Sequence, residues 1–133
     1  MSNVNRTEAL LDAVAHLKGY STNPDSSLYQ IRNPLGVFSF SRPGKNEIDE
    51  EGRRVFASDL AGRRACLFDL DLKISGESRA GIKKDDKLEN LLRIYGIHEL
   101  LGQNQVVKFL KRALKDESIS RVTPLSYFRN ESD

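Results

Sequence analysis

The sequence predicts an α+β domain in which an N-terminal helix and a C-terminal helical hairpin cover one face of a small, mostly antiparallel sheet. Three patterns predict it. Residues 6–18 carry apolar side chains at helical spacing, residues 64–75 alternate apolar and polar side chains, and residues 86–115 contain two further helical patterns. We expect residues 1–133 to form a single globular domain, on which the tail from about residue 124 docks loosely.

The first helix is expected over residues 6–18. Its apolar residues recur at helical spacing and are Leu10, Leu11, Val14 and Leu17. Asn5 followed by Glu8 has the capping-box pattern, and Gly19 is a typical residue for ending a helix. This segment is therefore predicted to be an amphipathic helix with a defined start and stop.

The sheet is expected to contain three strands, over residues 28–32, 36–41 and 64–75. The turn-forming pairs Asn33-Pro34 and Pro43-Gly44 bracket the first two. In the third strand, the apolar residues that share one face are Cys66, Phe68, Leu70, Leu72 and Ile74. Because that face is wholly apolar, we expect the helices to cover it.

Residues 46–62 have two interpretations. They fit a helix that Asn46 caps and Gly62 ends. Residues 54–60 also fit a strand that turns at Ala61-Gly62 and pairs with residues 64–75. The choice decides where the carboxylate of Asp59 lies.

Two helices are expected in the C-terminal third of the chain. The first covers residues 86–95, between the capping residue Asp85 and Gly96. The second covers residues 104–115, and its core-facing residues are Val106, Val107, Leu110 and Leu114, with Phe109 and Ala113 beside them. The connection between them is longer than the turn of a DNA-binding helix-turn-helix, so we expect a plain helical hairpin.

Composition sets limits on function. The 21 Lys and Arg residues nearly balance the 19 Asp and Glu residues, which leaves a formal charge of +2, so only local clustering can indicate an anionic partner. Cys66 is the single cysteine, which favours a reducing, cytoplasmic location. We expect no membrane partner, since no apolar run is long enough to span a bilayer. We expect no cofactor and no metal, because His16, His98 and Cys66 are widely separated.

One sequence pattern has the form of a catalytic motif. Asp71-Leu72-Lys73 matches the D-x-K element of Mg²⁺-dependent nucleases, in which carboxylates bind the metal and the lysine polarises the phosphate. A second carboxylate is required, and Asp59 supplies it only if residues 54–60 are a strand. The competing interpretation is an ordinary strand with charged side chains on its solvated face.

The loop that follows carries glycines at phosphate-loop spacing, Gly76 and Gly81. Ile82 stands where such a loop requires lysine, and Asp86 near the helix start would repel a triphosphate. We therefore interpret it as a basic loop that presents Lys83 and Lys84.

The last helix carries four cations at i, i+3, i+4 and i+7 spacing, Lys108, Lys111, Arg112 and Lys115. This basic stripe lies opposite the apolar face and could bind an anionic surface, with Lys83 and Lys84 added if they fold nearby. Cations near a helix C-terminus also offset the helix dipole. The leading hypothesis is a non-enzymatic intracellular interaction domain that contacts nucleic acid or an acidic protein. The nuclease above and a structural subunit that forms homo-oligomers are the alternatives.

Overall fold

The structure is a computed structural model that describes residues 5–20, 23, 25–36, 48, 52–76, 82–83 and 86–129. Within these ranges the chain is mostly helical. The elements are α1 (Arg6–Leu17), α2 (Ser27–Gln30), α3 (Asp59–Ile74), α4 (Leu88–Ile94), α5 (Leu100–Leu114) and the 3-10 helix η1 (Leu125–Phe128). The expected α+β fold is wrong, because the described residues contain no sheet and only two isolated bridges, Ile48 with Arg54 and Lys87 with Pro124.

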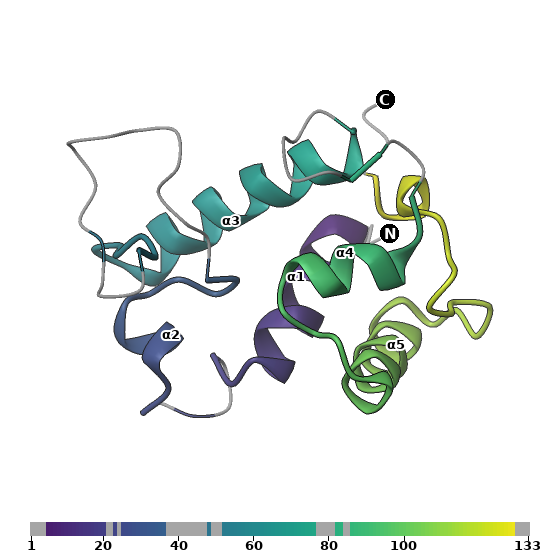
Figure 1. Ribbon diagram of the computed structural model, residues 1–133, viewed down its shortest axis with the longest axis horizontal. Helices are drawn as coiled ribbons and strands as arrows, with labels where there is room; N and C mark the ends of the chain where they lie inside the picture. Colours follow the sequence, from purple (N-terminus) through teal and green to yellow (C-terminus); the bar gives the residue numbers. More distant parts are fainter. Residues whose placement is uncertain are drawn as a thin grey trace.

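Helix α1 is the centre of the fold and packs against α3, α5 and η1 (Figure 1). Its predicted start is confirmed, since the Asn5 side chain accepts a hydrogen bond of 2.9 Å from the backbone N–H of Glu8. Beyond its end, Gly19 has a φ of 89°. The buried residues of α1 surround most of its circumference and are Thr7, Ala9, Leu10, Leu11, Ala13, Val14 and Ala15.

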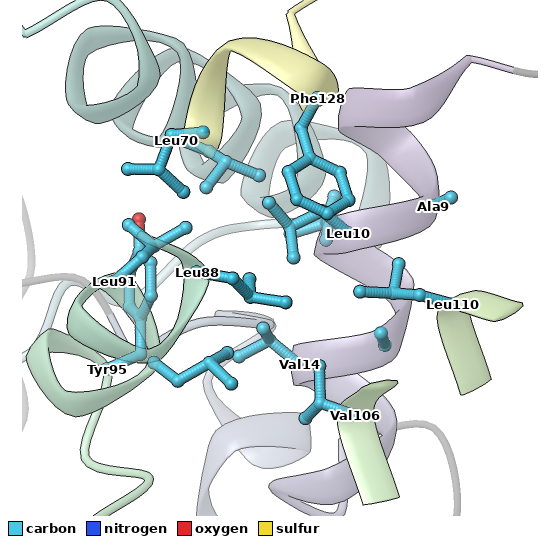
Figure 2. Packing of buried hydrophobic residues seen from close by; sticks show 14 of the residues in the cluster. Ala9, Leu10, Val14, Leu70, Leu88, Leu91, Tyr95, Val106, Leu110 and Phe128 are labelled. Carbon is cyan, nitrogen blue, oxygen red and sulfur yellow. The ribbon is translucent and has the colours of Figure 1, made fainter. Parts of the chain in front are cut away.

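The core consists of apolar side chains that converge on α1 from the other helices (Figure 2). Leu10 and Val14 of α1 meet residues from the remaining elements, which include Leu70, Leu88, Leu91, Leu110 and Phe128. All seven of these side chains are fully buried. Each buried side chain of this size stabilises the fold by roughly 1.5–3 kcal/mol. The helices are therefore held together by one shared core.

The predicted strand at residues 64–75 is wrong, because these residues lie in α3. The helix begins after Ser58, whose side chain accepts a hydrogen bond of 3.1 Å from the N–H of Ala61. The alternating pattern combines two helix faces: Cys66, Leu70 and Ile74 form the buried face at four-residue spacing. Phe68, which the strand would have placed with them, lies on the opposite side and is 66% exposed.

Neither interpretation of residues 46–62 holds for residues 52–58, and residues 59–62 are helical only as the first turn of α3. Residues 52–58 are neither helix nor strand, and Gly62 lies inside α3. A Cβ atom at position 62 would lie 1.7 Å from the backbone carbonyl oxygen of Arg32. Nearby, the N–H of Phe56 donates a hydrogen bond of 2.9 Å to the carbonyl of Ile31. Gly62 is thus needed for close approach of two backbones, not for ending a helix.

The first two predicted strands are not confirmed. Residues 28–32 form the short helix α2 and a turn, with Ser26 as the capping residue. Residues 37–41 lie outside the described residues. Between these segments Asn33 is fully buried, and its side-chain nitrogen donates to the carbonyl of Arg54 at 2.9 Å. The turn expected at Asn33-Pro34 is present, because the N–H of Gly36 donates to the carbonyl of Asn33 at 3.2 Å, but it does not join two strands.

The two C-terminal helices are confirmed as helices but not as a hairpin. In Figure 1, α4 lies across the view while α5 is seen nearly along its axis. The tail docks through η1, in which Leu125 and Phe128 are fully buried. The Thr7 hydroxyl donates a buried hydrogen bond of 2.6 Å to the carbonyl of Phe128. Helix α1 is therefore covered by segments from both halves of the chain.

Candidate functional site

An open groove of about 730 Å³ lies between α1 and α5, and we name it the α1–α5 groove. Its apolar lining residues are Ala13, Leu17, Phe109 and Ala113. Its polar lining residues are His16, Gln105, Lys108 and Arg112. The volume is within the range of roughly 300–1,000 Å³ that is usual for ligand sites in proteins.

The register of α5 explains which side chains reach the groove. Gln103, Val106 and Leu110 point into the core, so the side chains at positions 105, 108, 109 and 112 share the side that faces the end of α1. The Gln103 side chain donates a hydrogen bond of 3.0 Å to the carbonyl of Ile97, which is buried. This bond fixes the rotation of α5 at the end of the helix nearest to Leu17.

An aromatic contact across the groove joins its two helices. The rings of His16 and Phe109 have centroids 5.4 Å apart and are tilted by 40°. His16 is exposed, whereas Phe109 is partly buried against the core. Phe109 therefore presents one part of its ring to the core and leaves the remainder as apolar surface for a ligand.

The charge of the groove has one sign. Lys108 and Arg112 are both exposed, and neither forms an ion pair with any residue that the structure describes. No carboxylate stands among the residues that line this groove. Positive side chains beside a low-dielectric apolar surface create a local field that favours an anionic group.

A second, smaller hollow of about 380 Å³ adjoins the groove, and Phe109 and Ala113 line both. Here Arg63 of α3 donates to Asp12 at 2.6 Å and to Glu8 at 3.3 Å. The hydrogen bond with Asp12 raises the pKa of Arg63. The surface is thus positive at the Lys108 end and carries two carboxylates around one guanidinium at the other end.

The predicted basic stripe is divided by the fold. Lys108 and Arg112 line the α1–α5 groove, whereas Lys111 and Lys115 do not. Lys115 ends the helix in the left-handed conformation, with φ of 53°, and its N–H donates to the carbonyl of Lys111. Lys83 is exposed on the segment before α4 and does not line the α1–α5 groove. Lys84 lies outside the described residues.

The arrangement required by the nuclease hypothesis is not present. Asp59 and Asp71 belong to the same helix, and their positions separate them by about 18 Å along its axis. The Asp59 carboxylate accepts a hydrogen bond from the Tyr20 hydroxyl, and Lys73 is paired with Asp69 at 2.6 Å. Among the residues that can be described, no group of three His, Cys, Asp or Glu side chains could hold a metal ion.

Sequence reasoning missed His16 and Phe109 as groove residues. The pattern of the first helix counted only its apolar residues, and Phe109 was placed beside the core face of the last helix. The relevant signal is that Phe109 and Ala113 form an apolar flank directly next to Lys108 and Arg112. Phe109 and Ala113 face His16 only because the two helices pack against each other, and no local sequence pattern shows that packing.

Comparison with protein-family models, curated proteins and solved structures finds no significant match to this chain. In the part of the chain that the structure describes, no helix is both long enough and apolar enough to cross a membrane. The functional argument therefore depends on the α1–α5 groove itself.

Proposed function

We propose that the protein is an interaction domain that binds an acidic, amphipathic segment of a partner protein in the α1–α5 groove. The observation that carries this proposal is the position of Lys108 and Arg112, two exposed cations without ion pairs in the described structure, beside the apolar surface of Phe109. We also propose a cytoplasmic location, which the single buried cysteine, Cys66, supports.

The shape of the groove supports a helical ligand. On α5, Lys108 and Arg112 are one turn apart, with roughly 6 Å between their Cβ atoms. A partner helix with two carboxylates one turn apart can approach both cations while an apolar side chain covers Phe109. Such a ligand gains from apolar burial and from charge at the same time.

The adjoining hollow favours a peptide over a nucleic acid. A continuous phosphate backbone that followed the groove past Phe109 would approach the carboxylates of Glu8 and Asp12. Binding to phosphates also depends on many dispersed cations, whereas only two of the four stripe residues line this groove. A short acidic peptide needs to contact only the end of the groove that Lys108 and Arg112 line.

The test compares two charge-reversal variants of the same helix. One is Lys108→Glu/Arg112→Glu, which changes the groove, and the other is Lys111→Glu/Lys115→Glu, which changes the remainder of the stripe. Both lower the formal charge from +2 to −2, since each reversal removes two positive units. The probe is a fluorescein-labelled peptide of 15 residues with Leu and Glu at helical spacing, and a single-stranded DNA of equal charge is measured beside it.

We expect the groove variant to weaken peptide binding about tenfold, because a favourable charge contact becomes repulsive at two positions. The matched variant should weaken it less than threefold. Equal losses in the two variants would show diffuse electrostatic attraction and overturn the proposal. Tighter binding to the DNA than to the peptide at 0.15 M salt would favour nucleic acid instead, and no peptide binding at millimolar concentration would remove the proposal altogether.

A further inference from the structure

The outer side of α3 is apolar although no described element packs on it. Leu60 and Phe68 are 57% and 66% exposed, respectively. Arg64 and Asp71 are exposed as well. In Figure 1, α3 runs along the upper edge of the molecule, and α1 lies on the opposite, inner side of this helix.

These four residues form one continuous surface, which we name the α3 outer stripe. At 100° per residue, Leu60, Arg64, Phe68 and Asp71 fall within an arc of about 80° on the helix. Leu67 borders the stripe and is partly buried against the core. A helix with apolar residues on both its inner and its outer side is typical of one that is covered on both sides.

The two charged residues of the stripe have no partner within the described part of the chain. Arg63 and Asp69, on other sides of the same helix, are both paired, with Asp12 and Lys73 respectively. Although the Asp71 side chain is exposed, partial loss of solvent around its carboxylate raises its pKa, and no cation offsets that shift. Arg64 and Asp71 are thus free to form ion pairs with another molecule.

We infer that the α3 outer stripe is the contact between two copies of this chain, arranged antiparallel about a two-fold axis. Arg64 and Asp71 lie about 10 Å apart along the axis of α3, and the midpoint between them falls between Leu67 and Phe68. A two-fold axis at that point places each Arg64 against Asp71 of the second copy. The same rotation brings the two Phe68 side chains together at the centre, while the Leu60 side chains cover the edges.

The argument for a second copy is that the stripe is complementary to itself. An isologous interface requires opposite charges at equal distances from a shared centre, and one helix supplies both here. The stripe is smaller than the interface of a stable dimer, so association is weak, with a Kd of roughly 0.1–1 mM. This inference is independent of the α1–α5 groove, which is formed by other helices.

The experiment is sedimentation equilibrium of the full chain at concentrations up to about 1 mM, which is roughly the expected Kd. Arg64→Asp places two carboxylates against each other in the dimer, and Asp71→Arg places two guanidinium groups together. We expect each variant alone to weaken dimerisation at least tenfold. An equimolar mixture of the two variants should form a heterodimer, because both cross-contacts are then Asp with Arg.

Phe68→Ser should also weaken dimerisation, through the loss of the central apolar contact. Lys108→Asp is the matched control, since it makes the same change of charge in the groove and should leave dimerisation unchanged. A wild-type protein that remains monomeric at 1 mM would overturn the inference. So would Arg64→Asp that dimerises as well as wild type, or a mixture of the two variants that fails to associate. Circular dichroism of each variant verifies that loss of association is not loss of folding.

Discussion

The carboxylate of Asp69 accepts a hydrogen bond of 2.6 Å from the hydroxyl of Tyr95, which joins the middle of α3 to the end of α4. The same oxygen accepts a hydrogen bond of 2.6 Å from Nζ of Lys73. Lys73 also lies 5.1 Å from the centroid of the Tyr95 ring. Because Lys73 and Tyr95 are both buried, this network satisfies polar groups that water reaches poorly.

Replacement of Asp69 by alanine should destabilise the protein by about 2–3 kcal/mol, because the Lys73 ammonium loses its partner while it remains buried. Urea unfolding followed by circular dichroism measures the change. Asp71→Ala, on the exposed side of the same helix, should change stability by less than about 0.5 kcal/mol. Equal losses in the two variants would contradict a structural role for the Asp69 network.

Replacement of both Asp69 and Lys73 should destabilise the protein less than replacement of Asp69 alone. In Asp69→Leu/Lys73→Met no charge is left unpaired, and apolar groups of similar volume often substitute for a buried pair at little cost. We expect the double variant to be more stable than Asp69→Ala. A double variant as unstable as Asp69→Ala would show that the charges themselves contribute strongly to stability.

Stability should decline at alkaline pH partly through Tyr95. Burial, together with the neighbouring Asp69 carboxylate, raises the pKa of Tyr95 well above 10. The unfolded chain then loses a proton that the folded chain retains, so this contribution is complete below about pH 10 and falls as the pH rises above it. Urea midpoints between about pH 8 and 11 should decline less steeply for Tyr95→Phe than for wild type, whereas parallel declines would refute the assignment.

Replacement of Gly62 by alanine should cost about 3 kcal/mol, although alanine is the better helix former. The reason is that the new methyl group would overlap the carbonyl of Arg32. Thermal unfolding measures the loss, and Ala61→Gly is the control, because it lowers helix propensity by only about 1 kcal/mol at an exposed site. A Gly62→Ala protein of unchanged or increased stability would mean that the two backbones are farther apart.

The thiol of Cys66 should be unreactive in the folded protein. It is fully buried, and burial raises the pKa of this thiol to about 12. A chromogenic disulfide reagent at about pH 8 should label it only after denaturant is added. The variant Cys66→Ala/Ala61→Cys, with an exposed thiol, is the positive control and should react without denaturant. Rapid labelling of native Cys66 would show that this part of the core opens easily.

The parts of the fold that the sequence predicts well are those in which the large apolar residues share one helix face. This holds for Leu10 and Val14 of α1, although smaller side chains are buried around most of that helix, and for Val106 and Leu110 of α5, so the spacing identifies both helices. In α3 the exposed Phe68 stands between the buried Cys66 and Leu70 in the sequence, so residues from two helix faces together imitate strand alternation. The role of Gly62 was predicted wrongly, because glycine is needed there to make room for the backbone of Arg32, which is distant in the sequence.

The candidate site was predicted in part. The residues Lys108 and Arg112 follow from helical spacing alone, and the structure places both on the α1–α5 groove. Their separation from Lys111 and Lys115 depends on where α1 crosses α5, and this is a tertiary relationship. The contribution of His16 depends on the same crossing.

The hydrogen bond between Thr7 and Phe128 links the first helix to a segment synthesised more than a hundred residues later. While the ribosome is still producing η1, the apolar side chains of α1 lack part of their native cover. Contacts of such large sequence separation slow folding, because a long loop must close before they form. A nascent chain of this protein therefore cannot complete the packing of α1 until Phe128 has left the ribosome.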